Sequence, residues 1–297
     1  MNQHREEVRD FLTSRRDRLT PDRAGLPIYG ANRRVKGLRR DEVAVLSGIS
    51  TDYYTRLERG NLSGVSEQVL EALAAALQLD EAERAHLFDL AKVANTRPTA
   101  RSVGSARTSR KQGLRPGVRL ILEGMSAPAY VRNARMDILA LNRLGRALFS
   151  DAMSADADEP AGFNLARYLF LDQRSREFYS DWATVARDCV ASLRGEAGRN
   201  PYDRGLTDLV GELSTRSEEF RTWWAAHNVK LHRTSTKQMH HRVVGDLELT
   251  GEALTLPGDP GLTIITYTVE PASPSAEALC FLTRWSRADL PHVVDDR

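Results

Sequence analysis

Apolar side chains recur at helical spacing through the first part of the chain. Val8, Phe11, Leu12 and Leu19 lie at i, i+3, i+4 and i+11, and Arg15 interrupts this stripe at i+7. Because an α-helix turns once every 3.6 residues, these positions share one face. The pattern predicts an amphipathic helix near the N-terminus.

Two later helices are expected to begin at residues that suit an N-cap. Ser66 precedes an apolar-periodic run, and Asp80 is followed three residues later by Glu83, which is the spacing of a capping box. No strand signal appears before residue 94. Residues 1–93 are therefore expected to form an all-α domain of five helices.

The stretch LRRDEVAVLSGISTDYYTRLERG, residues 38–60, indicates two short helices joined by a turn. Gly48 suits a positive φ at the turn, and the small Ala44 lets the helices approach closely. If the second helix spans about residues 50–59, Tyr54 and Leu57 face inward. The outward face then carries Asp52, Thr55, Arg56 and Arg59, with Thr51 at its edge. A polar strip of this kind fits the width of a DNA major groove.

Beyond residue 113 the pattern changes to strands at both ends and helices between them. APAYVRN and MDILALN alternate as a short antiparallel pair, and QMHHRVVGDLELTGEALTL followed by LTIITYTV supplies further strands. The clearest helical stretches are 143–149, 182–193 and 206–227. Residues 114–297 are therefore expected to form an α+β domain around one antiparallel sheet.

Residues 94–113 lack hydrophobic periodicity and are rich in Ser, Thr, Arg and Gly, so they are expected to be a flexible linker. This segment holds five basic residues and no acidic one. Residues 1–113 carry 20 Lys and Arg against 15 Asp and Glu, whereas the remainder carries 22 against 25. The basic N-terminal part suits a polyanionic partner.

Composition excludes several classes of protein. A hydrophobic fraction of 41% and a charged fraction of 28% are typical of a globular protein, and no apolar run approaches the length of a membrane span. With no secretory signal, the chain is expected to be cytoplasmic and not to bind a membrane. Cys189 and Cys280 are expected to be core residues.

No catalytic or metal-binding motif is apparent, so we expect no enzyme activity, no metal and no cofactor. The neighbouring His240 and His241 would point to opposite faces of a strand, which prevents them from chelating together.

The helical pair resembles the helix-turn-helix of the XRE family, which includes the lambdoid phage repressors. The matching residues are Ala44, the turn at 48–50, the inward Tyr54 and Leu57, and the sequence ERG at 58–60. The resemblance implies a lambda-repressor-like fold that binds double-stranded operator DNA. It implies that bases are read by Thr51, Asp52, Thr55 and Arg56, and that phosphates are contacted by Arg33, Arg34, Lys36, Arg40, Tyr53, Arg59 and Asn61.

Other roles remain open for some of these residues. Asp52 has two interpretations, base reading and stabilisation of the N-terminus of its helix. Arg40 matches a position that either touches phosphate or supports a reading residue. For Tyr53, Arg59 and Asn61 the alternative to a phosphate contact is a solvated surface group. The connection 20–37 is longer than is usual before this motif.

The second part resembles the ligand-binding domain of MmyB-like transcription regulators, which has a PAS-like fold. The resemblance is carried by residues 114–149, by GLTDLVGELSTRSEEFRTWWAAHNV and by HHRVVGDLELTGEAL. It implies a pocket for a small lipophilic ligand between the sheet and the helices. The candidate lining residues are Tyr130, Leu139, Phe149, Leu213, Phe220 and Trp224, with His241 as a polar anchor or, alternatively, a satisfied core histidine.

Together these features predict a one-component transcription regulator. The helix-turn-helix would bind operator DNA as a homodimer, and a small effector in the second domain would modulate binding. The alternative is an assembly module whose helix-turn-helix docks a partner protein. The outward arginines and the basic linker favour DNA.

Overall fold

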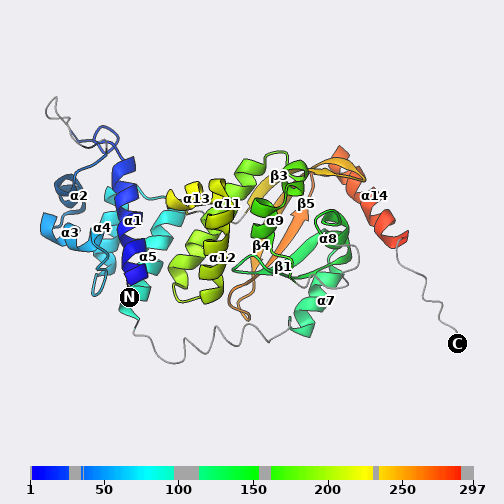
Figure 1. Cartoon of the computed structure of the whole chain (residues 1–297), viewed down its shortest axis with the longest axis horizontal. Coiled ribbons are helices and arrows are strands. Elements are labelled where there is room, and N and C mark those ends of the chain that lie inside the picture. Colours follow the sequence, from blue (N-terminus) through cyan, green and yellow to red (C-terminus); the bar gives the residue numbers. More distant parts are fainter. Residues whose placement is uncertain are drawn as a thin grey trace. The chain divides into compact units, whose positions relative to one another are not determined.

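The computed structural model describes residues 2–26, 35, 37–96, 114–153, 162–229 and 234–288. The described residues before 97 form five helices, as the sequence pattern predicts (Figure 1). They are α1 (Asn2–Arg18), α2 (Arg40–Ser47), α3 (Thr51–Glu58), α4 (Glu67–Ala76) and α5 (Glu81–Asn95). The N-terminal region is therefore all-α.

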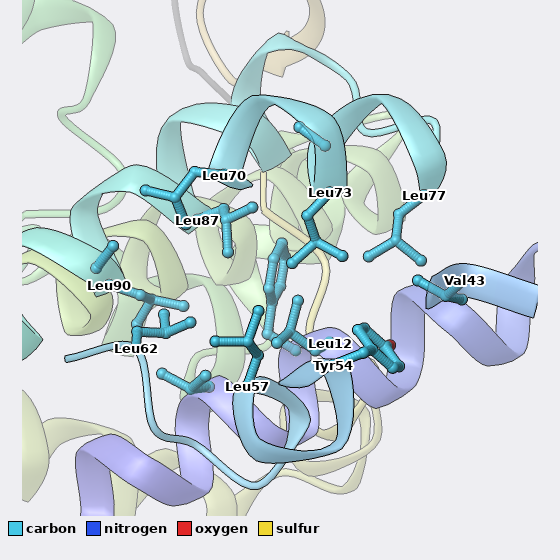
Figure 2. Close-up of a cluster of buried hydrophobic side chains, with 14 of the residues drawn as sticks. Leu12, Val43, Tyr54, Leu57, Leu62, Leu70, Leu73, Leu77, Leu87 and Leu90 are labelled. Carbon is cyan, nitrogen blue, oxygen red and sulfur yellow. The ribbon is translucent and has the colours of Figure 1, made fainter. Parts of the chain in front are cut away.

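These helices enclose an apolar core to which each of them contributes. Figure 2 shows Leu12 of α1, Val43 of α2 and Leu57 of α3 facing leucines of α4 and α5. Arg15, which interrupts the stripe of α1, is only 1% exposed. Its Nε lies 3.2 Å from Oε1 of Glu83, so the charge that enters the core is paired.

The helix starts follow the predicted capping chemistry. The Ser66 side chain accepts a hydrogen bond from the amide of Val69 at the start of α4. At the start of α5, Asp80 and Glu83 form a reciprocal capping box. Both pairs satisfy backbone amides that have no partner within their own helix.

The C-terminal region is α+β with a five-stranded antiparallel sheet, again as predicted (Figure 1). The strands are β1 (Ala129–Asn133), β2 (Ile138–Leu141), β3 (Thr234–His241), β4 (Gly245–Thr255) and β5 (Leu262–Thr268), in the order β2-β1-β5-β4-β3. The helices are α7 (Pro116–Gly124), α8 (Arg143–Leu148), α9 (Leu165–Leu171), α10 (Arg174–Phe178), α11 (Trp182–Arg199), α12 (Arg204–Arg216), α13 (Glu218–Ala225) and α14 (Pro274–Ala288).

The register of the strands sorts their side chains onto two faces. Val131 of β1 pairs with Ile264 of β5, and this face packs against Val118 of α7. On the other face, Tyr130 lies opposite Ile265, and Gly251 of β4 lies opposite Tyr267. A Cβ at residue 251 would be 3.1 Å from Cε1 of Tyr267, so the glycine leaves room for the ring on that face.

The helical stretch predicted over residues 206–227 is two helices, because α12 ends at Arg216 and α13 begins at Glu218. Ser217 lies between them, and its Oγ accepts a hydrogen bond from the amide of Phe220. The Ser217 side chain thus acts as the N-cap of α13, a position at which Ser is strongly preferred. Cys189 is buried as expected, but Cys280 is exposed on α14.

The described chain forms two compact units. The first contains α1 to α5, Val190–Asp208 and the segment that starts at Arg221. The second contains the sheet, Leu209–Phe220 and the remaining helices. The boundary falls within α11, after Cys189, so two segments beyond residue 113 pack in the same unit as the N-terminal helices. Residues 97–113 of the predicted linker lie outside the described residues.

Candidate nucleic-acid interface and candidate ligand site

A left-handed turn joins α2 to α3. Gly48 has a φ of +66°, and the amide of Ile49 donates to the carbonyl of Ala44 at 3.0 Å. Ser50 then caps α3, because its Oγ accepts from the amide of Tyr53 at 3.1 Å. The positive φ expected at Gly48 is confirmed, and this turn determines the angle at which α3 leaves α2.

The two sides of α3 agree with the helical pattern. Tyr54 and Leu57 are fully buried in the core of the N-terminal helices. The opposite side carries exposed Thr51, Asp52, Arg56 and Arg59, with Thr55 half-buried. The four residues predicted to read bases therefore stand on the side of α3 that faces away from the core.

Arg56 is oriented by two neighbours. Its Nη2 donates to the carbonyl of Ser63 at 3.2 Å, and its guanidinium carbon lies 5.7 Å from the centroid of the Tyr53 ring. A guanidinium has five N–H donors, so one bond to Ser63 leaves others for an outside acceptor. The remaining donors suit the two acceptors on the edge of a guanine.

A buried carboxylate fixes α3 to its neighbours. Glu58 is 2% exposed, and its two oxygens accept from Nε of Arg16 at 2.8 Å and Nε of Arg40 at 2.9 Å. Arg16 also donates to the carbonyl of Leu38 at 2.9 Å. Burial alone would raise the pKa of Glu58, but the bonds from Arg16 and Arg40 outweigh it and hold the pKa below its ordinary value.

The residues predicted to contact phosphate have different surroundings. The half-exposed Arg40 is tied to Glu58, and Arg59 is exposed at the end of α3. Tyr53 and Asn61 are half-buried, and the side-chain oxygen of Asn61 accepts from the Ser63 amide. Arg33, Arg34 and Lys36 lie outside the described residues.

In the second unit, aromatic rings gather between the sheet and the helices. Tyr130 meets Phe149 nearly edge-to-face at 5.7 Å between ring centroids, and Phe149 lies 5.6 Å from Phe178. Tyr267 is 6.2 Å from Tyr130. Two of the predicted pocket residues, Tyr130 and Phe149, therefore lie together in a buried aromatic cluster.

Lys237 lies beside this cluster and was not among the predicted site residues. It is only 7% exposed, and its Nζ is 5.8 Å from the centroid of the Tyr267 ring. Among the described residues, no hydrogen bond or ion pair involves its ammonium group. Burial lowers the pKa of Lys237 to about 8, because the charged form loses its hydration. Alternation along β3 could have revealed it, since Lys237 is in phase with the buried Met239 and His241.

A second polar group is buried nearby. The backbone of Tyr179 forms a β-bridge with Met239 of β3, which is two residues after Lys237 on that strand. The Tyr179 hydroxyl is buried and has no hydrogen-bond partner within the described residues. Burial holds the pKa of Tyr179 well above its ordinary value, so the hydroxyl stays protonated and can donate.

The other predicted pocket residues have differing surroundings. Leu213 and Phe220 are fully buried, and the Phe220 ring contacts Phe170 at 5.0 Å. Leu139 is exposed, because the alternation of edge strand β2 turns it outward. Trp224 belongs to the first unit, where Arg194 stacks on its ring at 3.7 Å.

His241 has both ring nitrogens occupied. Its Nε2 lies 3.0 Å from the carbonyl of Ala147, and its Nδ1 accepts from the amide of Val243 at 3.2 Å. The ring therefore carries its proton on Nε2, which donates to Ala147. This geometry favours the alternative of a satisfied core histidine over a ligand anchor.

No group of three His, Cys, Asp or Glu residues that could hold a metal ion occurs in the described part of the chain. Within the same residues, no helix has the length and apolar character needed to cross a membrane.

Comparison with known families agrees with this arrangement. Residues 7–87 match a helix-turn-helix domain, and residues 114–282 match the MmyB-like transcription regulator ligand binding domain. Both families are regulatory rather than enzymatic. No curated protein matches the chain. Because the second match covers more than half of the sequence, the chain belongs to the family of MmyB-like transcription regulators, with a helix-turn-helix domain ahead of its ligand-binding domain.

Proposed function

We propose that this chain is a one-component transcription regulator that binds operator DNA and responds to a small lipophilic ligand. The observation that carries the DNA-binding part is the polar outer side of α3, which stands opposite a fully buried Tyr54 and Leu57. A short helix with one buried side and one exposed polar side is the form in which recognition helices enter the major groove.

In this proposal the residues that contact DNA divide into two roles. Arg56 pairs with a guanine edge, and Asp52 accepts from a cytosine amino group or stabilises the helix N-terminus. Thr51 and Thr55 contact neighbouring base edges. The phosphates are bound by Arg33, Arg34, Lys36, Arg40, Tyr53, Arg59 and Asn61.

The ligand part rests on Lys237. Lys237 has no hydrogen bond or ion pair among the described residues, and the attraction of Asp188 and of the Tyr267 ring does not offset its loss of hydration. An acidic head group would stabilise the ammonium charge in this medium of low dielectric. Tyr130, Phe149 and Tyr267 offer apolar walls beside it. The ligand is therefore a lipophilic molecule with an acidic head group, bound in the interior of the second unit.

The DNA-binding proposal is tested by selecting duplexes from a randomised library with the full-length protein. Arg56→Ala should relax the preference at one base pair and cost about 1–3 kcal/mol on the selected sequence. Arg59→Ala is the matched control, because an exposed phosphate contact should weaken all sequences alike. If Arg56→Ala also weakened all duplexes alike, Arg56 would not read bases. If no sequence were enriched, the protein-docking alternative would be favoured.

The ligand proposal is tested by extracting the purified full-length protein with organic solvent and analysing the extract by mass spectrometry. A lipophilic acid should co-purify with the wild type and be lost from Lys237→Met. Lys92→Met is the control, because Lys92 is exposed on α5. Recovery of the same molecule from Lys237→Met would show that Lys237 is not its anchor.

A further inference from the structure

The second half of α11 packs against the DNA-binding helices inside the first unit. Gly198 lies against His86 of α5, where a Cβ would be only 2.7 Å from Nδ1 of the imidazole. Val229, which follows α13, is part of the hydrophobic core formed by α1 to α5. Two segments from the family's ligand-binding region therefore dock on the helices that carry the helix-turn-helix.

A buried ion pair lies at the centre of this contact. Arg194 of α11 is 3% exposed, and its Nη1 donates to Oε2 of Glu7 at 2.6 Å. Its guanidinium also donates to the carbonyl of Trp224 and stacks on the Trp224 ring. His86 and His227 each approach Oε1 of Glu7 at 3.8 Å. The carboxylate of α1 is thus surrounded by cationic or neutral donors from three other segments.

The contact is built from polar groups that are incompletely satisfied. Oε1 of Glu7, Nε of Arg194 and both ring nitrogens of His86 are buried without a hydrogen-bond partner among the described residues. Each such atom loses its hydration and receives no full hydrogen bond in return. A surface of this kind separates more readily than an apolar one, because water can satisfy these atoms once they are exposed.

α11 is continuous from Trp182 to Arg199, and it carries different contacts at its two ends. Cys189 is buried in the second unit and lies close enough to Lys237 for the two to affect each other's pKa. Arg194 and Gly198 follow within the next turns and belong to the first unit. Because a helix is stiff over so short a length, a displacement at Cys189 is carried to Arg194.

We propose that the contact of Arg194 and Gly198 with Glu7 and His86 is a latch through which the ligand-binding region controls DNA binding. The control of DNA binding by this latch rests on the proposed function, whereas the contact itself is a property of the fold. Ligand bound next to Lys237 displaces α11, and the latch passes that displacement to α1 and α5. Arg194 is a positioning residue in this scheme, since it touches neither ligand nor DNA.

The latch is tested by a size-complementation series in the full-length protein. Gly198→Ala adds a methyl group against His86, and His86→Ala in the double variant removes the obstruction. Gly195→Ala is the matched control, because it lies on the same helix and its Cβ would meet only Arg199, at 3.7 Å. Glu7→Gln removes the charge that pairs with Arg194, so it weakens the same contact through a different residue.

Amide hydrogen exchange reports docking without ligand or DNA. In Gly198→Ala and Glu7→Gln, amides of α1 and of residues 190–199 should exchange about tenfold faster than in wild type. Gly195→Ala should leave them within about twofold, and the double variant should recover most of the protection. Unchanged exchange in both Gly198→Ala and Glu7→Gln would overturn the latch.

A second measurement tests whether the latch controls DNA binding. It is the affinity for a random-sequence duplex, measured by fluorescence anisotropy at low salt. Gly198→Ala should change this affinity by at least about threefold, and Gly195→Ala and the double variant should stay near wild type. Faster exchange with unchanged affinity would refute the control of DNA binding by the latch. Failure of the wild type to bind any duplex would instead refute the proposed function, while the exchange data would still decide whether the latch exists.

Discussion

At the residue scale, the ammonium group of Lys237 is solvated less well in the folded protein than in water. Its folded pKa of about 8 lies below the ordinary value of 10.5, so between these values the unfolded chain binds more protons than the folded one. The free energy of unfolding therefore rises with pH in this window, and the penalty is fully present below pH 8. A bound acidic head group would remove the effect by restoring the pKa.

This gives a prediction for ligand-free protein. From pH 7.5 to 9.5, the free energy of unfolding of the wild type should gain about 1–2 kcal/mol relative to Lys237→Met. Urea denaturation at each pH measures the difference, and the comparison cancels the titration of other groups. Parallel pH profiles for the two proteins would mean that the ammonium group is not desolvated in the fold.

Glu58 is the opposite case, a buried acid with two partners. Glu58→Gln leaves Arg16 and Arg40 without their carboxylate and should cost about 3–5 kcal/mol in the free energy of unfolding. Glu71→Gln is the control: Glu71 pairs with Arg84, both side chains are about half exposed, and ion pairs in water contribute little to stability. Urea denaturation distinguishes the two, and similar losses would contradict the role of Glu58.

The pH dependence of Glu58 follows from its lowered pKa. The stabilisation that it supplies is present above the pKa of the unfolded carboxyl and is lost as the pH falls through the lower folded pKa. Glu58→Gln should therefore lack part of the acid destabilisation of the wild type. A steeper acid loss in the variant would contradict this assignment.

At the scale of elements, the glycines that follow α2 and α3 are required for different reasons. Gly48 and Gly60 both have positive φ, but a Cβ on Gly48 meets nothing within 4 Å. A Cβ on Gly60 would be 2.8 Å from Cα of Arg5 and would overlap the backbone carbonyl of that residue on α1. Gly48 therefore needs only its conformation, whereas Gly60 also needs its small size.

Gly48→Ala should cost about 1 kcal/mol in the free energy of unfolding, which is the strain of a left-handed alanine. Gly60→Ala should cost clearly more, because the backbone of α1 has to move as well. Guanidinium denaturation of the full-length protein measures both. Equal losses at the two sites would show that α1 and α3 separate easily.

At the scale of the whole molecule, one helix-turn-helix buries too little surface for tight specific binding. We therefore expect a homodimer on an inverted repeat whose half-sites lie about one helical turn, or a multiple, apart. Native mass spectrometry with a selected duplex should give two chains per duplex, and a duplex with one half-site is the control. Affinity should fall steeply with salt, because phosphate contacts release counterions. One chain per duplex at saturation would rule out the dimer.

Local chemistry accounts for most of what could be predicted from the sequence. The five N-terminal helices, the caps at Ser66 and Asp80 and the inward Tyr54 and Leu57 follow from periodicity and backbone hydrogen bonding over a few residues. The strands β1 and β2 follow in the same way from alternation. The break at Ser217 was missed, because the hydrophobic period continues across it and only the observed cap reveals it.

The candidate sites also differ in whether local sequence or tertiary structure determines them. The polar side of α3 was determined by the sequence alone, since one helix and its period decide which residues face outward. The surroundings of Lys237 and the contact between Glu7 and Arg194 were decided only by the tertiary structure. The Glu7–Arg194 pair joins residues 187 positions apart. Such pairings depend on how whole elements pack, and burial then changes the cost of each charge, which no local pattern can encode.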